Sequence, residues 1–244
     1  MTQPGLKLSI VIPAYNEAGK IKNTFSRLER FFSQKPYEME YVFVDDGSSD
    51  DTLAVLRELQ GSRRNIKIRV NEKNTGKGYS IRKGMLSAEG AYCLFMDADM
   101  STSLGAFDEF EKSLGGFDII MGSRWKEESN VKIPQPWCRK IMGHVFYAIV
   151  RAFLLKGITD TNCGFKCYRR EAARDLFSKQ RLRGWGFDVE LLYIAQKRGY
   201  RIKEIPVVWG HGRDSRVNLF VVPALTLMEL AAIKINDWKG RYEK

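Results

Sequence analysis

The segment Ala91-Tyr-Cys-Leu-Phe-Met-Asp-Ala-Asp99 combines an apolar run that is typical of a buried strand with two carboxylates at its end. Two earlier runs have the same character. Leu8–Ile12 is followed by Pro13-Ala-Tyr-Asn-Glu17, and Tyr41–Val44 is followed by Asp45-Asp-Gly-Ser-Ser-Asp50. Ligands of parallel α/β sheets bind beyond the carboxyl ends of the strands. We therefore expect these three polar stretches to converge on one site.

Amphipathic segments lie between the apolar runs, with apolar residues at the spacing of a helix. The expected strands are 8–12, 41–44, 66–70, 91–96 and 118–121, and the expected helices are 17–32, 49–60 with Ser49 or Asp50 as its N-cap, 77–86 and 104–114. Alternating strands and helices through residue 121 predict βαβ units. The predicted fold class is therefore α/β, with a mostly parallel sheet flanked by helices.

The second half of the chain alternates less regularly. The expected elements there are a long amphipathic helix over 137–155, a strand or loop over 160–170, a helix over 187–198, a strand over 201–209 and an amphipathic helix over 218–238. No linker separates the two halves. We therefore expect a single domain over residues 1–217, made of the halves 1–121 and 122–217, followed by a C-terminal helix within 218–244.

The charge of the chain is unevenly distributed. The 244 residues carry 40 Lys and Arg against 29 Asp and Glu, a net charge of +11. Residues 1–118 hold 16 basic and 17 acidic side chains (net −1), 119–183 hold 14 and 5 (net +9), and 184–244 hold 10 and 7 (net +3). A basic half attracts nucleic acid, phosphorylated ligands or an anionic membrane. Charge alone does not choose among these partners.

Several classes of site and segment are not expected. Cys163 and Cys167 have no second pair at zinc spacing, and reduced thiols in the cytoplasm are the default expectation. Only two histidines, His144 and His211, are present for a histidine-based hydrolase. No dinucleotide-binding or P-loop motif occurs. The run Leu8–Ile12 is too short for a signal peptide, and no apolar run reaches the length of a membrane span.

The acidic pairs carry the clearest chemistry. Asp97 and Asp99 can face one open site, where two like charges require a compensating cation. Oxygen ligands of this kind suit Mg²⁺ or Mn²⁺, which bind through carboxylates together with substrate phosphates. Asp45 or Asp46 can accept hydrogen bonds from a ribose hydroxyl or a base N–H. The alternatives are a solvated strand end for the first pair and an ordinary capped turn for the second.

Five short motifs occur in the order found in family 2 glycosyltransferases: Val11–Glu17, Val44–Asp50, Asn74-Thr-Gly-Lys-Gly78, Met96–Asp99 and Gly122-Ser-Arg124. The chain resembles that family, and this implies a GT-A fold. The segments Asp160–Lys166 and Phe187–Leu192 are similar to those of polyprenyl-phosphate sugar synthases, most of all dolichyl-phosphate β-glucosyltransferases. The resemblance implies that residues 1–121 bind the nucleotide sugar and that residues 122–217 bind the acceptor.

The resemblance also implies a role for each matching residue. The residues that it assigns to the nucleotide sugar are Pro13, Ala14, Tyr15, Glu17, Asp45, Asp46, Lys77, Gly78, Asp97, Ala98, Asp99, Ser215 and Arg216. It places a Mg²⁺ or Mn²⁺ ion at Asp99 and Asp97. It places the acceptor phosphate near Arg124 and Arg139, and it gives Asp188 the task of orienting the acceptor or the sugar.

The function implied by the resemblance is inverting transfer of glucose from UDP-glucose to a polyprenyl phosphate, such as dolichyl or undecaprenyl phosphate, in protein glycosylation. A GDP-mannose-dependent mannosyltransferase is the alternative within the family. Mannose synthases usually have Gln where this chain has Ser101, and commonly Gln where it has Asp188, which favours glucose. A basic nucleic-acid-binding protein is the remote alternative from another class.

A lipid acceptor predicts contact with a membrane. The amphipathic segments 137–155 and 218–238 can lie in a membrane interface with their basic and aromatic ends, or they can pack on the domain. The aromatic residues that could form a groove for the isoprenoid chain are Trp125, Trp137, Phe146 and Phe153. We expect a peripheral protein on the cytoplasmic face of the membrane.

Overall fold

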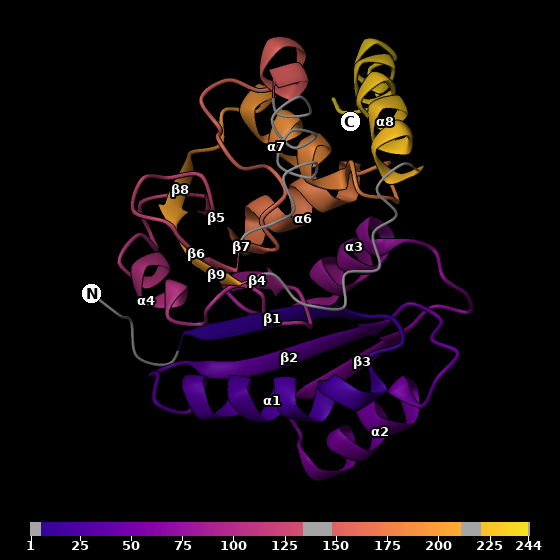
Figure 1. Cartoon of the computed structure of the whole chain (residues 1–244), viewed down its shortest axis with the longest axis vertical. Helices are drawn as coiled ribbons and strands as arrows, with labels where there is room; N and C mark the ends of the chain where they lie inside the picture. The colour runs from indigo at the N-terminus through magenta and orange to yellow at the C-terminus, as the bar shows by residue number, and fades with distance from the viewer. Residues whose placement is uncertain (1–5, 134–147, 211–220, 244) are drawn as a thin grey trace.

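The computed structural model describes residues 6–133, 148–210 and 221–243. Its centre is a seven-stranded sheet (Figure 1). In spatial order the strands are β3 (Ile66–Val70), β2 (Glu38–Asp45), β1 (Lys7–Ala14), β4 (Tyr92–Met96), β7 (Phe165–Arg169), β5 (Ile119–Ser123) and β8 (Ile202–Pro206). Within this sheet, β7 runs antiparallel to both of its neighbours and the other pairs are parallel. The predicted mixed, mostly parallel sheet is confirmed.

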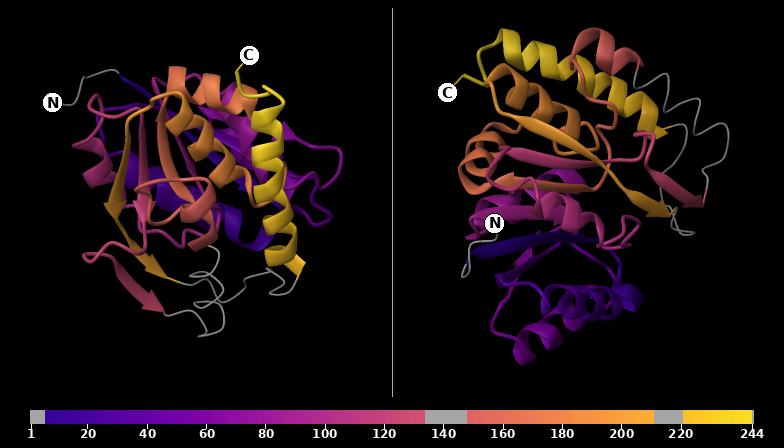
Figure 2. Two further views of the ribbon diagram at one scale, coloured as in Figure 1. Left: turned by 90° about the horizontal axis from the view of Figure 1, so that it is seen from above. Right: turned by 90° about the vertical axis from the view of Figure 1, so that its left-hand side faces the viewer.

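Helices cover both faces of this sheet (Figure 2). The helices are α1 (Ala18–Phe32), α2 (Thr52–Ser62), α3 (Lys77–Ser87), α4 (Ala106–Glu111), α6 (Arg170–Lys179), α7 (Phe187–Lys197) and α8 (Val221–Trp238). One apolar cluster joins α1, α2 and α4 to the sheet, and a second joins α3, α6, α7 and α8 to it. Neighbouring residues of β1 divide between the clusters, with Ile10 and Ile12 in one and Val11 in the other, as the alternation of a strand requires.

The first strand runs further than its apolar core suggests. Pro13 lies within β1 and pairs in register with Val44, although we expected the strand to stop before it. The pairing of β1 with β4 covers only Leu8–Val11 on the β1 side. Because Pro13 lies beyond that pairing, its missing N–H costs the sheet no bond to β4.

The second half of the chain contains elements that the sequence did not predict. Helix α6 was not expected, and the segment 201–209 is not one strand. It splits into β8 and β9 (Val208–Gly210), and β9 pairs with β6 (Asn130–Ile133) in a separate two-stranded sheet. The backbone N–H of Val207, between β8 and β9, bonds to Ser123 O at the end of β5. The segment therefore changes sheets at the same edge where β5 ends.

The C-terminal helix packs on the domain. Leu230 and Ile233 of α8 are buried in the same cluster as α7, and Asp237 accepts hydrogen bonds from Tyr193 Oη (2.6 Å) and Lys197 Nζ (2.5 Å). Residues 148–153 are helical, whereas most of the expected helix 137–155 lies outside the described residues. In the described part of the chain, no helix has the length and apolar character needed to cross a membrane.

Candidate active site

The ends of β1 and β2 are held together by hydrogen bonds between their following loops. Asp46 N donates to Ala14 O (2.8 Å), and Asn16 N donates to Ser48 Oγ (3.0 Å). The Asn16 side chain accepts from Ser49 N (2.8 Å). Asn16 has φ of 55°, a left-handed conformation that asparagine tolerates better than most residues. The two polar stretches predicted to converge therefore do so.

The end of β4 joins this edge through Asp97. Lys77, the first residue of α3, places its Nζ 2.6 Å from Asp97 Oδ1 and 5.2 Å from the centre of the Trp185 ring. Burial by itself would lower the pKa of Lys77, but the carboxylates of Asp97, Asp188 and Asp99 outweigh it and raise that pKa. The lysine therefore stays charged beside three acids. The structure thus brings together four of the predicted site residues: Lys77, Asp97, Asp99 and Asp188.

Asp99 is exposed at the same edge. Its Oδ1 accepts from the backbone N–H of Ser101 (2.9 Å), so Ser101 contributes its backbone to this turn. Between them, Met100 has φ of 53°, which is unusual for a bulky residue and is typical of functional turns. The carbonyl of Ala98 accepts from Thr24 Oγ1 (2.8 Å) of α1. The Asp-x-Asp turn is thus fixed from two sides.

A buried ion pair lies behind Asp97. Lys166 on β7 is fully buried, and its Nζ is 2.6 Å from Asp188 Oδ1 and 2.7 Å from Cys163 O. Burial raises the pKa of Asp188 even though Lys166 and Lys77 oppose that shift. Lys166, Asp188, Lys77 and Asp97 thus alternate in sign, and the pair Lys166–Asp188 at one end is buried, where the dielectric constant is low. Asp188 therefore lies close to Lys77 and Asp97 and is paired with a lysine that the sequence analysis did not single out, while its role toward the acceptor or the sugar stays a prediction.

Arg124 occupies a second charged position, beyond the end of β5. Its Nε and Nη2 donate to the two oxygens of Asp160 (2.7 and 2.8 Å), and its backbone N–H also donates to Oδ2 (2.9 Å). The guanidinium carbon lies 5.4 Å from the centre of the Trp209 ring. Burial would lower the pKa of Arg124, but Asp160, with a smaller contribution from Asp97, raises it. The bidentate geometry fixes the plane of the guanidinium group.

Asp46 has a structural task in this site. Its carboxylate accepts hydrogen bonds from Asn71 Nδ2 (2.8 Å), Thr75 N (2.9 Å), Thr75 Oγ1 (2.8 Å) and Gly76 N (3.1 Å). These bonds hold the loop that precedes α3 and thereby position Lys77. Asp45, also buried, accepts from Ser48 N (3.3 Å). The nucleotide contacts assigned to both acids stay predictions.

The other nucleotide-binding candidates divide into two groups. Pro13, Ala14, Tyr15 and Glu17 lie at the end of β1 and in the loop after it, and the Tyr15 side chain is 39% exposed. Gly78 instead packs against α7, because a Cβ there would lie 2.7 Å from Phe187 Cβ and 2.8 Å from Gly184 O. The predicted residues outside the described part are Arg139, Ser215 and Arg216, together with Trp137 and Phe146.

The acids at this edge suit a divalent ion only with help from a ligand. Across residues 6–133, 148–210 and 221–243, no three His, Cys, Asp or Glu side chains are grouped as a metal site. Two carboxylates plus substrate phosphates are a normal set for Mg²⁺ or Mn²⁺. Asp97 already contacts the Lys77 ammonium group, so a metal ion would share this carboxylate with the lysine. The residues present fit a divalent ion that arrives with a diphosphate.

Sequence reasoning did not give a role to Asp160, Lys166 or Trp185. The first two lie in the motif Asp160–Lys166, which resembles that of the sugar synthases only as a whole segment. A lysine inside the otherwise apolar strand Phe165-Lys-Cys-Tyr168 was the available signal, because a buried charge requires a partner. Trp185 lies in a loop, and its position over Lys77 depends on tertiary contacts.

A protein-family model and named relatives match most of the chain. Residues 9–177 match the family model described as glycosyl transferase family 2. The chain is 35% identical over 236 residues to a dolichyl-phosphate beta-glucosyltransferase of Trichomonas vaginalis, covering 91% of this chain and 70% of that protein. It is 37% identical over 228 residues to the human dolichyl-phosphate beta-glucosyltransferase, covering 88% and 70%.

Solved structures share the fold at low sequence identity. Glucosyl-3-phosphoglycerate synthase from Mycobacterium tuberculosis, in complex with Mn²⁺, UDP and phosphoglyceric acid, has a TM-score of 0.69 at 16% identity, covering 94% of this chain and 78% of that one. Mannosyl-3-phosphoglycerate synthase from Rubrobacter xylanophilus has a TM-score of 0.70 at 17% identity, covering 97% and 75%. The expected GT-A architecture is confirmed by these neighbours.

Proposed function

The chain belongs to glycosyl transferase family 2, and from that premise we propose that it transfers glucose from UDP-glucose to a polyprenyl phosphate with inversion at the sugar. The observation that carries the proposal is the alternation of acids and bases at the carboxyl edge of the sheet, where Asp97 meets Lys77 and Arg124 lies beyond the next parallel strand end. Relatives more than 30% identical carry the name dolichyl-phosphate beta-glucosyltransferase, which supports the choice of sugar and acceptor.

The reaction requires no strong base. A phosphate oxygen of the acceptor attacks C1 of glucose and forms the new C–O bond. The bond from C1 to the diphosphate breaks on the opposite face, and its electron pair leaves with UDP. Because the acceptor phosphate is ionised at neutral pH, no proton has to be removed from it. The protein must therefore reduce the repulsion between two anions rather than deprotonate one of them.

The donor side of the site would neutralise the negative charge of the UDP diphosphate. Asp97 and Asp99 would hold a Mg²⁺ or Mn²⁺ ion together with the diphosphate. Such an ion supplies charge neutralisation for the departing UDP. Lys77 adds a permanent positive charge within 2.6 Å of Asp97. Pro13, Tyr15 and Glu17, together with Asp45 and Asp46 at the end of β2, would surround the nucleoside.

The acceptor side presents basic groups. Arg124, whose guanidinium plane is held by Asp160, is proposed to bind the phosphate of the lipid together with Arg139. Asp188 is a positioning residue in this scheme, because it pairs with Lys166 and lies near Lys77. It can keep the Lys77 amine directed toward the donor.

Access to a lipid is proposed through α8. Four of its residues, Met228, Ala231, Ile235 and Trp238, form an exposed stripe at helical spacing on the side away from Leu230 and Ile233. The helical turns of residues 148–153 lie at the same end of the molecule as α8 (Figures 1 and 2), and Phe153 within these turns is 69% exposed. Apolar residues flanked by lysines are typical of interfacial helices. We place this end on the cytoplasmic face of the membrane.

Incubation of the protein with UDP-glucose, Mg²⁺ and either dolichyl or undecaprenyl phosphate tests the proposal. We expect a lipid-linked glucose that extracts into organic solvent and a matched release of UDP. The same reaction with GDP-mannose as competing donor should leave the glucose product unchanged. Glycosylation of a water-soluble saccharide without any lipid product would show that the acceptor is assigned wrongly, and a mannosyl lipid that exceeds the glucosyl lipid would overturn the donor.

A further inference from the structure

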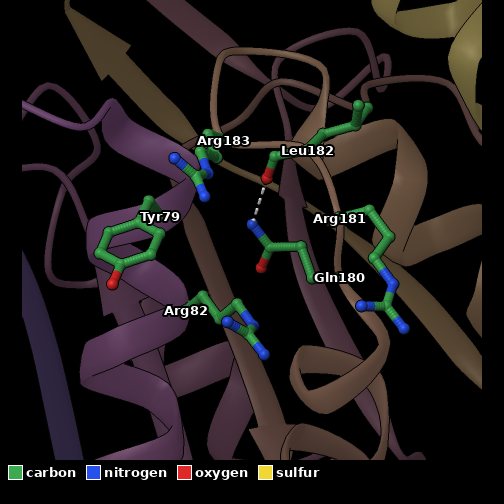
Figure 3. A pocket seen from close by; sticks show the side chains of 6 residues that line it. All are labelled: Tyr79, Arg82, Gln180, Arg181, Leu182 and Arg183. Atoms are coloured by element: carbon green, nitrogen blue, oxygen red, sulfur yellow. Dashed lines mark hydrogen bonds between the residues drawn. The ribbon is translucent and has the colours of Figure 1, made fainter.

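A basic cavity lies between α3 and the loop that joins α6 to α7. Its volume is about 190 Å³, and Figure 3 shows the side chains around it. The lining residues are Tyr79, Arg82, Gln180, Arg181, Leu182 and Arg183. Lys77 and the acids of the donor site do not line it. The cavity is therefore separate from the place where the nucleotide sugar is expected.

Three guanidinium groups give this cavity its charge. Arg82 donates through Nε to Phe177 O (2.8 Å) at the end of α6, and the Arg183 guanidinium lies 5.5 Å from the centre of the Tyr79 ring. Within the described residues, no carboxylate forms an ion pair with Arg82, Arg181 or Arg183. The nearby acid Glu190 accepts from the backbone N–H groups of Arg181 and Leu182 instead. The positive charge of the three arginines is left for another anion.

Gln180 adds a hydrogen-bond acceptor with a fixed direction. The residue is only 3% exposed, and its Nε2 donates to Gly78 O (2.9 Å) and Leu182 O (2.8 Å). Rotating the amide by half a turn would place Oε1 against two carbonyl oxygens, so the orientation is determined. Oε1 is buried and has no hydrogen-bond partner within the described part of the chain. In Figure 3 it faces the side of the cavity where Tyr79 and Arg82 lie.

The wall around this acceptor is firmly held. Tyr79 N donates to Arg183 O (3.2 Å), and a Cβ atom at Gly76 would lie 2.6 Å from that same oxygen. The loop therefore lies directly against the beginning of α3. The backbone around the cavity is thus already in place before a ligand enters, which reduces the entropic cost of binding.

We propose that this cavity binds a small phosphate-bearing anion that retains at least one O–H donor. The arginines satisfy the negative oxygens, with the strength of charge-assisted bonds. The donor O–H satisfies Gln180 Oε1, which otherwise stays buried without a partner at a cost. A monoanionic or dianionic phosphate meets both requirements. Sulfate has the same shape but carries no proton at neutral pH, so it meets only the first.

Calorimetric titration of the full chain with inorganic phosphate and with sulfate tests this site. UDP and Mg²⁺ are present at saturation, so that the donor site is filled. We expect saturable phosphate binding that is about fivefold or more tighter than sulfate binding, the value of one hydrogen bond of roughly 1 kcal/mol. Arg181→Gln and Arg183→Gln should each weaken phosphate binding about tenfold. Arg57→Gln, on the exposed side of α2, is the matched control and should leave it unchanged.

Three results would count against the site. Absence of saturable phosphate binding to the wild-type protein overturns it. Binding that survives both arginine substitutions places the phosphate elsewhere, for example at Arg124. Equal affinity for phosphate and sulfate removes the role assigned to Gln180. Because all three readouts measure binding with the donor site filled, they are independent of whether glucose transfer to a lipid occurs.

Discussion

Asp97 has very little freedom, because a cation lies on one side of it and a glycine on the other. Its Oδ1 is 2.6 Å from Lys77 Nζ, and a Cβ atom at Gly164 would lie 2.0 Å from its Oδ2. Gly164→Ala must therefore displace the carboxylate. We expect turnover to fall about 100-fold, the scale of a misplacement of roughly 1 Å in a catalytic group. Measurement of lipid-linked glucose formation checks this.

Gly19→Ala is the matched control for that substitution. A Cβ at Gly19 would have no neighbour within 4 Å, and the residue lies in α1, where alanine is the better helix former. We expect unchanged turnover and slightly higher stability. If Gly164→Ala were as active as Gly19→Ala, Asp97 would not need its present position.

Asp99 can be substituted in a way that tests its role in glucose transfer without destabilising the fold. It is exposed, and its carboxylate accepts a hydrogen bond from the backbone N–H of Ser101. Asp99→Ala should therefore reduce glucose transfer at least about 1000-fold, the loss of roughly 4 kcal/mol of transition-state stabilisation, while the unfolding midpoint changes little. Asp51→Asn, also exposed, should retain activity. Mn²⁺ binding in the presence of UDP can be followed by electron paramagnetic resonance. It should be lost in Asp99→Ala and retained in Asp51→Asn.

Asp160 links stability to pH through Arg124. Burial would raise the pKa of Asp160, but Arg124 outweighs it, so the folded-state pKa lies below the unfolded value of about 3.9. The contribution of the pair is therefore present above pH ~4 and is lost as the pH falls through the lower, folded-state pKa. Asp160→Asn should destabilise the protein by about 3 kcal/mol at pH 7, because Arg124 is left without its partner. Urea unfolding should show this difference shrinking below pH ~4, and a constant difference would contradict the role of the pair.

At the scale of elements, the sequence predicted best where local patterns decide the outcome. The apolar runs that precede Pro13, Asp45 and Asp97 are long enough to identify strands, and the rule for parallel sheets then placed their ends together. Helix α6 and the small β6–β9 sheet were missed. The strand β9 has only three residues, and its partner lies 78 positions away at β6, so no local pattern specifies it. Tertiary pairing decides such elements.

Helix α8 is apolar on two sides, and only one of them is covered by the described part of the domain. Ile235 is 50% exposed and Trp238 is 87% exposed. Ile235→Ser and Trp238→Ser should each reduce binding to phospholipid vesicles by about three- to tenfold, because less apolar surface enters the interface. Val70→Ser on β3, 41% exposed, is the control and should change nothing. Vesicle sedimentation measures binding, and equal binding of all three variants would remove α8 from the membrane contact.

At the scale of the whole molecule, the sequence predicted which acids belong to the candidate site. It did not predict the ion pairs that these residues form. The acids and Arg124 belong to short motifs. Their partners come from one later segment: Lys166 lies on β7, which runs antiparallel between β4 and β5, and Asp160 lies in the loop just before β7. Only the folded chain brings that segment beside Asp97 and Arg124. Long-range ion pairs of this kind leave no periodic signal in the sequence.

The net charge of +11 predicts that binding of the whole molecule to an anionic membrane depends on salt. Exposed lysines and arginines near an anionic bilayer each contribute about 1 kcal/mol, and salt screens them beyond a Debye length of about 10 Å at 0.1 M. Binding to vesicles that contain phosphatidylserine should therefore weaken steeply as salt rises, whereas binding to neutral vesicles should be weak at every salt concentration. Lys239→Glu, beside Trp238, should weaken binding to the anionic vesicles further. Equal, salt-independent binding to both kinds of vesicle would mean that the apolar stripe of α8 acts alone and that the basic charge serves the phosphates of the substrates instead.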